Sequence, residues 1–282
     1  MAFNKNILIT GCSSGIGLCC ARELKQRGYR VFATARSIGD VEKLSALGLE
    51  SLQLDLADSD SISRAVETVL QQSDGKLFAL FNNAAYGQPG AVEDLSREVL
   101  RQQFETNLFG AHELTSRVIP IMRKQGYGRI IQNSSVLGLA ALPYRGAYNA
   151  SKFALEGLSD TLRLELTGTG IHVSLIEPGP IESQFRANAY AMFKQNIDRE
   201  HSAHRDYYRG VEARLAKQGH AQPFTLPPEA VLKKLIQALE SPRPKPRYYV
   251  TLPTYLFGYA RRLFSSRMLD RILLKISSGE NK

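Results

Sequence analysis

Hydrophobic runs of strand length alternate with helical patterns through most of this chain. Apolar or β-rich runs predict strands at residues 6–10, 29–35, 49–54, 77–81, 128–132, 172–176 and 247–251. Helical periodicity predicts helices at residues 16–27, 61–72, about 97–122 and 147–166, with another starting at Pro227-Pro228. We therefore expect an α/β fold, with one doubly wound parallel sheet of about seven strands and helices on both faces.

The regular alternation stops after Pro178-Gly179-Pro180. Residues 182–222 are polar with scattered Tyr and His, and we interpret them as a mobile helical flap over a pocket rather than as a separate domain. We expect residues 1–282 to form a single domain that ends in a basic extension at 252–282.

The extension predicts an amphipathic basic helix, because apolar residues recur at helical spacing from Phe264 to Ile276 with Arg and Lys between them. Such a helix would pack on its own domain or on a dimer partner, or it would rest on an anionic membrane surface. Nucleic acid is not expected as a partner, because we find no recognised nucleic-acid motif and no aromatic platform.

Composition is that of an ordinary globular protein, with 43% hydrophobic and 22% charged residues in 282. This excludes collagen-like, disordered and disulfide-scaffold classes. The sequence has no run of ~18 apolar residues and no start shaped like a signal peptide, so we expect a cytoplasmic protein, peripheral to a membrane if the extension binds lipid. The three cysteines, at 12, 19 and 20, form neither a disulfide framework nor a metal site, and we expect no metal.

Charge is concentrated at the C-terminal end. The net charge is +9, and residues 241–282 contribute nine Lys or Arg against two acids, which leaves only +2 for the rest of the chain. The basic character therefore belongs to the C-terminal end and not to the body of the chain.

A glycine-rich turn, Gly11-x-x-x-Gly15-x-Gly17, joins the first predicted strand to the first helix. Such a turn lets backbone N–H groups approach a pyrophosphate at the start of a helix. The second strand ends at Arg36, and no acid follows until Asp40, so the guanidinium fits a 2′-phosphate better than a ribose hydroxyl. With a further hydroxyl contact from Ser14, the sequence favours NADP(H) over NAD(H).

The third and fourth predicted strands end in polar side chains. Asp55 would bind the adenine amino group or cap the following turn. Asn82-Asn83-Ala84-Ala85 follows the fourth strand, where its amides would contact a ligand or tie loops together.

Candidate acid–base chemistry lies in the helix at 147–166. Tyr148 and Lys152 are four residues apart and share one helix face. A neighbouring ammonium and an oxidised nicotinamide both favour the phenolate, so the tyrosine could exchange a proton with a reacting oxygen. Ser135 follows the strand at 128–132, where its hydroxyl would face the same pocket. Asn107 is a poor helix former inside a helical stretch, which is consistent with a role such as ordering a water.

Together, residues 10–17 and 82–85, Asn107, Ser135, Tyr148-x-x-x-Lys152 and Pro178-Gly179 resemble the short-chain dehydrogenase/reductase family over about residues 5–185. The resemblance implies a Rossmann-type fold in which Tyr148 is the proton donor or acceptor, Lys152 binds the nicotinamide ribose, Ser135 holds the substrate oxygen and Asn107 completes a water-mediated tetrad. The cofactor contacts it implies are Gly11, Ser13, Ser14, Gly15, Ile16, Arg36, Asp55, Leu56, Asn83, Ala84, Tyr148, Lys152, Pro178, Gly179, Ile181 and Ser183. One departure is Ala85, where the family usually has glycine.

Within the family, residues 10–17 and 151–157 are similar to 17β-hydroxysteroid and retinol dehydrogenases, and residues 174–181 and 224–230 are similar to bacterial NADP-dependent aldehyde reductases. This implies interconversion of a hydrophobic aldehyde or ketone with its alcohol, in a homodimer or homotetramer. Ser135 and Tyr148 would contact the substrate, with Val136, Leu142 and Tyr144 as apolar walls. The alternative is a non-catalytic protein that senses a dinucleotide and binds a partner; such a protein should lack Ser135, Tyr148 or Lys152, and this chain has all three.

Overall fold

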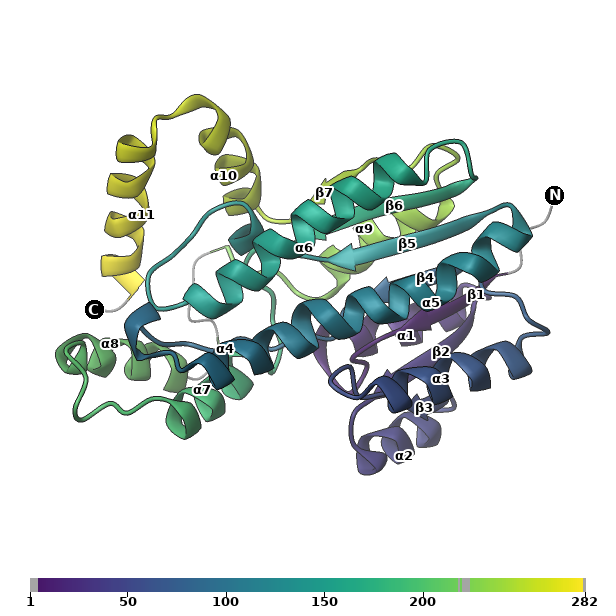
Figure 1. Cartoon of the computed structure of the whole chain (residues 1–282), viewed down its shortest axis with the longest axis horizontal. Coiled ribbons are helices and arrows are strands. Elements are labelled where there is room, and N and C mark those ends of the chain that lie inside the picture. Colours follow the sequence, from purple (N-terminus) through teal and green to yellow (C-terminus); the bar gives the residue numbers. More distant parts are fainter. Residues whose placement is uncertain (1–4, 218, 220–223, 281–282) are drawn as a thin grey trace.

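The computed structural model describes residues 5–217, 219 and 224–280, and it contains a seven-stranded parallel sheet (Figure 1). The strands are β1 (Asn6–Ile9), β2 (Arg30–Ala35), β3 (Glu50–Gln53), β4 (Ala79–Asn82), β5 (Gly128–Asn133), β6 (Ile171–Glu177) and β7 (Arg247–Tyr249). Their spatial order is β3-β2-β1-β4-β5-β6-β7, so the chain changes direction of winding between β1 and β4. The segments that follow these two adjacent strands lead to opposite sides of this point, and open α/β sheets bind ligands at such a position.

Helices cover both faces of the sheet, which confirms the predicted doubly wound fold. They are α1 (Gly15–Gln26), α2 (Ile38–Ala46), α3 (Ser59–Gln72), α4 (Arg97–Phe104), α5 (Gly110–Gln125), α6 (Gly146–Glu165), α7 (Phe185–Asn196), α8 (Arg205–Ala216), α9 (Glu229–Glu240), α10 (Leu252–Leu263) and α11 (Ser266–Glu280). Strand β1 shows why there are two cores: Ile7 and Ile9 point to the face covered by α1 and α9, and Leu8 points to the face covered by α3 and α5. Cys12 and Cys20 are free thiols packed in the first core.

The helical stretch predicted at 97–122 is divided in the structure. A π-helical turn, Glu105–Phe109, separates α4 from α5. Helix α5 begins at Gly110, where an added Cβ would lie 1.9 Å from the Leu56 carbonyl oxygen, so the helix can approach the end of β3 only through a glycine. The register shift changes the direction in which Asn107 points, and single π turns of this kind often occur at functional sites.

Two pairs of helices lie beyond the carboxyl ends of the strands, towards the side to which the β5 arrow points in Figure 1. One pair is α7 and α8, from the segment predicted as a flap, and it has its own small core around Phe193, Tyr208 and Val211. The other pair is α10 and α11, from the basic extension. Residues 218 and 220–222 of the predicted flap, and 281–282 of the extension, lie outside the described residues.

Candidate active site

A large cavity of about 1530 Å³ runs along the carboxyl edge of the sheet. Every residue that we expected to contact the cofactor lines it, from the turn after β1 to the segment after β6. So do Ser135, Val136 and Leu142 from the expected substrate side. The topology thus brings the residues predicted to bind the nucleotide and the residues predicted to carry out the reaction into one continuous cavity.

The glycine-rich turn after β1 forms a close-fitting cradle. Gly11 and Gly15 have positive φ angles of 70° and 55°, a backbone conformation that favours glycine. A Cβ at Gly11 would lie 2.8 Å from the Ala84 Cα, so the turn fits against the loop after β4 only without a side chain. Ser14, the N-cap residue of α1, makes no side-chain capping hydrogen bond, which leaves first-turn amides for an anion. These features fit a dinucleotide pyrophosphate.

The amide side chains after β4 hold this cradle together. Asn83 donates to the Thr10 carbonyl oxygen at 2.9 Å and accepts from the Asn133 amide at 2.9 Å. Asn82 donates to Thr115 on α5 at 2.8 Å. Both asparagines therefore tie loops and elements together, and Asn83 in addition lines the cavity.

Arg36 lies exposed at the rim of the cavity, at the end of β2. Asp40 also lines the cavity, but its carboxylate accepts from Ser37 Oγ at 2.8 Å and from Lys43 Nζ at 2.9 Å. The hydrogen bonds from Lys43 and Ser37 hold the pKa of Asp40 below its usual range. Asp40, the first acid after β2, is thus occupied by hydrogen bonds within α2, and Arg36 is the charged side chain nearest the end of the strand. The sequence analysis did not predict helix α2.

Asp55 caps the turn after β3, because its Oδ1 accepts from the Ala57 amide at 3.0 Å. The same side chain lines the cavity beside Leu56, and contact with adenine stays a prediction.

Tyr148 and Lys152 project from α6 towards the end of β5. The Lys152 ammonium lies 5.6 Å from the centroid of the Tyr148 ring and donates to the Asn133 carbonyl oxygen at 2.7 Å. Burial raises the pKa of Tyr148 to about 12, and a hydrogen bond from Ser135 opposes this rise. The sequence argument expected the ammonium to lower this pKa; in the chain by itself, desolvation is the larger effect. Tyr148 is therefore a protonated phenol at neutral pH, ready to donate.

Burial acts on Lys152 in the opposite sense. Desolvation lowers the pKa of Lys152 to about 8, and the negative charge of Glu156, one turn further along α6, opposes the change. The ammonium thus stays largely protonated at neutral pH but titrates within an accessible range.

Asn107 is buried in the π turn and does not line the large cavity. Its Oδ1 accepts from the Tyr86 amide at 3.1 Å, and its Nδ2 donates to the Tyr86 carbonyl oxygen at 2.9 Å and to Ser151 Oγ at 3.2 Å. The side chain therefore fastens the loop after β4 to α6 between Tyr148 and Lys152. A water-mediated role for Asn107 stays a prediction.

Tyr144 lies outside the large cavity, unlike the other expected apolar walls. Its backbone has a positive φ of 62°, and its ring packs against His204, Tyr207 and Tyr208 with centroid distances of 5.6, 6.0 and 6.0 Å. The flap helix α8 and its N-cap residue, His204, supply these partners, which sequence reasoning could not place.

Phe185 is a wall residue that the sequence analysis missed. Its ring meets the Tyr148 ring edge-to-face at a centroid distance of 5.2 Å, and Gly87 leaves room for it, since a Cβ there would lie 2.9 Å from Phe185 Cζ. The available signal was a large aromatic residue two positions after Ser183, a predicted nicotinamide contact. Further apolar lining from the extension was also missed, namely Leu256 and Phe257 on α10 and Leu273 and Ile276 on α11.

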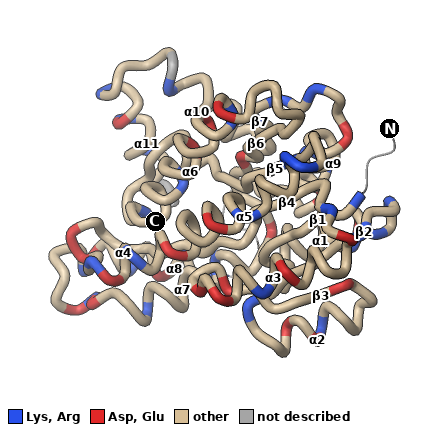
Figure 2. Tube along the Cα trace, turned by 45° about the vertical axis from the view of Figure 1, so that its right-hand side comes forward, with Lys and Arg blue, Asp and Glu red and all other residues tan. Residues whose placement is uncertain are grey.

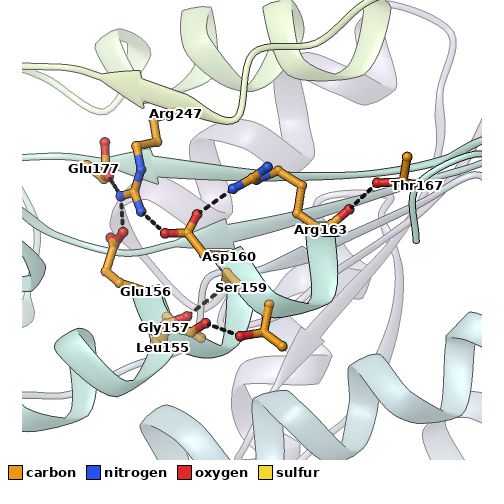
Figure 3. Close-up of polar contacts among 10 residues, drawn as sticks. Leu155, Glu156, Gly157, Ser159, Asp160, Arg163, Thr167, Glu177 and Arg247 are labelled. Carbon is orange, nitrogen blue, oxygen red and sulfur yellow. Dashed lines mark hydrogen bonds and ion pairs between the residues drawn. The ribbon is translucent and has the colours of Figure 1, made fainter. Parts of the chain in front are cut away.

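A partly buried ionic cluster anchors α6 to β6 and β7 (Figure 3). Arg247 on β7 forms ion pairs with Glu156 on α6, with Asp160 on α6 at 2.6 Å and with Glu177 at the end of β6 at 2.5 Å. Three carboxylates surround one guanidinium. Desolvation and the charge of Glu156 raise the pKa of Glu177 to about 8, so the cluster tends to retain a proton. The sequence signal for this cluster was a glutamate in the apolar run of β6.

Comparisons with known proteins agree with this geometry. The family model described as short chain dehydrogenase matches residues 5–193. The chain is 45% identical over 269 residues to the uncharacterized oxidoreductase YbbO of Escherichia coli strain K12, covering 95% of this chain and 94% of the relative. It is 36% identical to human 17-beta-hydroxysteroid dehydrogenase type 1, covering 87% and 77%. A crystal structure of a short-chain dehydrogenase from Streptomyces avermitilis superposes with a TM-score of 0.76 at 28% identity, covering 98% and 97% of the two chains.

Proposed function

The chain belongs to the short-chain dehydrogenase/reductase family of oxidoreductases, which use nicotinamide dinucleotides, and we propose that it is an NADPH-dependent reductase of hydrophobic aldehydes or ketones. The observation that carries this proposal is one cavity with Arg36 at its outer end and Ser135, Tyr148 and Lys152 at its inner end. The apolar walls around the inner end, including Val136 and Phe185, support a hydrophobic substrate.

The protein's own groups account for carbonyl activation. Ser135 and Tyr148 would both donate to the carbonyl oxygen, which makes the carbonyl carbon more electrophilic. As charge develops on that oxygen, Tyr148 transfers its proton, and the nearby Lys152 ammonium stabilises the phenolate that is left. When bound, NADPH supplies the hydride that reduces the carbon. Lys152 would also donate to the ribose hydroxyls of the nucleotide.

The remaining residues would hold the nucleotide in place. The amides at the start of α1 and the turn at Gly11–Gly15 would bind the pyrophosphate, as the cradle described above allows. Arg36 would form charge-assisted hydrogen bonds with the 2′-phosphate, and Pro178, Gly179, Ile181 and Ser183 would border the nicotinamide.

The test is NADPH oxidation with medium-chain aldehydes, retinal and a keto-steroid, with NADH as the matched control. We expect turnover with NADPH on at least one hydrophobic carbonyl, a lower kcat/KM with NADH, and, with NADPH deuterated at the transferred position, deuterium on the product carbinol carbon. Tight NADPH binding without turnover of any of these carbonyls would instead support the dinucleotide-sensing alternative.

A further inference from the structure

The helical hairpin α10–α11 carries an apolar stripe on its outer side. Leu252, Leu256, Tyr259 and Leu263 recur at spacings of four, three and four residues, which places them on one face of α10. Their exposed fractions are 52%, 60%, 60% and 77%, whereas Thr254 on the other side is fully buried. A Cβ at Gly258 would lie 2.6 Å from the Tyr249 ring, so close packing against β7 fixes the stripe outwards.

Helix α11 adds a basic face to this apolar stripe. Arg267, Arg271 and Lys275 follow one another at intervals of four residues and are all exposed. The opposite side of the helix buries Leu273 and Ser277 against the rest of the chain, in agreement with packing of the extension on its own domain. From residue 252 to residue 282 the sequence has six Lys or Arg and two acids, so the hairpin is strongly basic.

The same hairpin forms part of the wall of the active-site cavity. Pro253, Leu256 and Phe257 on α10 and Leu273 and Ile276 on α11 line the cavity that also contains Tyr148. The connection between the two helices projects from the edge of the molecule in both views (Figures 1 and 2), and basic residues are visible along it in Figure 2. Leu256 therefore belongs both to the apolar stripe and to the wall of the cavity, so the stripe leads to the cavity.

We propose that the α10–α11 hairpin docks on the surface of an anionic lipid bilayer and receives the hydrophobic carbonyl substrate from it. The apolar stripe would enter the boundary between headgroups and acyl chains, while the basic face would bind anionic headgroups. The part concerning substrate delivery rests on the proposed reductase function; the docking itself does not.

Other occupants fit the hairpin less well. A second copy of this chain, related by two-fold symmetry, would bring two basic faces together. Nucleic acid would match the basic face but would leave the apolar stripe exposed. Crossing the bilayer is ruled out by length for α10, since 12 residues extend ~18 Å and a hydrocarbon core is ~30 Å thick. Among all described helices, none is both long and apolar enough to cross a membrane.

The first test is flotation of the full chain with vesicles, without cofactor or substrate. We expect binding to vesicles of phosphatidylcholine with phosphatidylglycerol at low salt, at least tenfold weaker binding to pure phosphatidylcholine, and weaker binding at high salt. Failure to float with the anionic vesicles at low salt would overturn the proposal and would leave the reductase proposal untouched.

Two variants and a matched control locate the docking surface. Tyr259→Glu/Leu263→Glu alters the apolar stripe, and Arg267→Glu/Arg271→Glu/Lys275→Glu reverses the basic face; none of these residues lines the cavity. Each should reduce vesicle binding at least tenfold and leave turnover of a short, water-soluble aldehyde unchanged. Arg123→Glu/Lys124→Glu, on the exposed side of α5, should still bind.

An equal loss of binding in the α5 control would contradict the assignment of this surface. A second result would also contradict it: the wild type does not bind vesicles, and the stripe variant sediments as a monomer where the wild type sediments as a dimer. The stripe would then be an interface between two copies of the chain. If vesicle binding behaves as expected but no carbonyl is reduced, the reductase proposal fails and the docking stands.

Discussion

Tyr148 and Lys152 respond in opposite ways to the same burial. Desolvation raises the pKa of the phenol to about 12 and lowers the pKa of the amine to about 8. Near neutral pH both groups therefore carry a proton, one as a neutral donor and the other as a cation. This protonation state suits reduction, in which the tyrosine must give up a proton and the lysine must stabilise the resulting charge.

The first prediction concerns the pH dependence of cofactor capture. Because the pKa of Lys152 is lowered to about 8, raising the pH through that value removes the ammonium from the free enzyme. The kcat/KM for NADPH in carbonyl reduction should then fall about tenfold per pH unit above about 8, since this parameter reports ionisations of the free enzyme. A steady-state pH profile measures it, and a flat profile well above that pH would contradict the role given to the ammonium.

The second prediction concerns Arg36. Arg36→Glu should raise the KM for NADPH at least tenfold and change the KM for NADH much less, because only NADPH has the 2′-phosphate that the carboxylate would repel. Steady-state kinetics with both cofactors measures the effect. Arg123→Glu, at an exposed position of α5 away from the cavity, is the matched control and should leave both constants unchanged. Equal losses with both cofactors would mean that Arg36 does not distinguish them.

The sequence predicted most of the side chains that line the cavity, although Asn107 and Tyr144 lie outside it, and it did not predict how each side chain is held. Gly11, Arg36 and Tyr148 could be placed because each follows or starts a predicted element at the same sheet edge. Phe185 and Tyr144 could not be placed in this way. Their neighbours, Tyr148 and Tyr208, come from other segments of the chain, and the sequence pattern does not show how those segments pack together.

Among the elements, α6 depends most on an interaction far away in the sequence. Arg247 on β7 joins Glu156 and Asp160 on α6 to Glu177 on β6, and it thereby fixes the helix that presents Tyr148 and Lys152 (Figure 3). Periodicity predicted α6 and β6 well, but it does not report a charge pairing across 70 or more positions. The π turn that divides α4 from α5 was also missed, because the hydrophobic pattern of five residues does not distinguish a π-helical turn from an α-helical one.

The third prediction tests this cluster through stability. The pKa of Glu177 is about 8 in the folded chain, above its ordinary value of 4.5, so the folded state holds a proton that the unfolded chain has lost. This contribution is complete below the unfolded pKa and disappears as the pH rises through about 8. Unfolding by denaturant should therefore show the free energy of unfolding falling by on the order of 4 kcal/mol from about pH 5 to about pH 9.

Glu177→Gln should remove most of that pH dependence, because the amide imitates the protonated acid. Glu42→Gln, at an exposed position of α2, is the control and should keep the wild-type slope. A Glu177→Gln variant with an unchanged slope would show that the retained proton lies elsewhere.

At the scale of the whole molecule, the alternation of strands and helices was enough to predict the doubly wound sheet. The pattern does not contain the packing of the hairpin α10–α11, which was expected as an amphipathic helix with several possible partners. Leu273 is buried, and it borders a second pocket together with residues such as Leu142 and Phe153, more than a hundred positions away in the sequence. Local periodicity therefore predicts the sheet and the helices that cover it, while contacts between residues far apart in the sequence determine the walls of the cavity.

The fourth prediction concerns cofactor choice by the intact protein. A ligand that binds only the folded state stabilises it by ~2.7 kcal/mol at a hundred times its Kd. Saturating NADPH should therefore raise the melting temperature by several degrees, and NADH at the same concentration should raise it much less. Thermal melts followed by circular dichroism measure this without any substrate. Equal shifts with the two nucleotides would contradict the NADP(H) preference.

The most direct test of the account is the removal of one oxygen atom. Tyr148→Phe keeps the ring that packs against Phe185 and removes only the hydroxyl bonded to Ser135. NADPH-dependent carbonyl reduction, measured together with NADPH affinity by fluorescence titration, should fall by ~10²–10⁴-fold while the Kd for NADPH changes less than about twofold. A Tyr148→Phe variant that retains full turnover would contradict the central claim that this phenol supplies the proton.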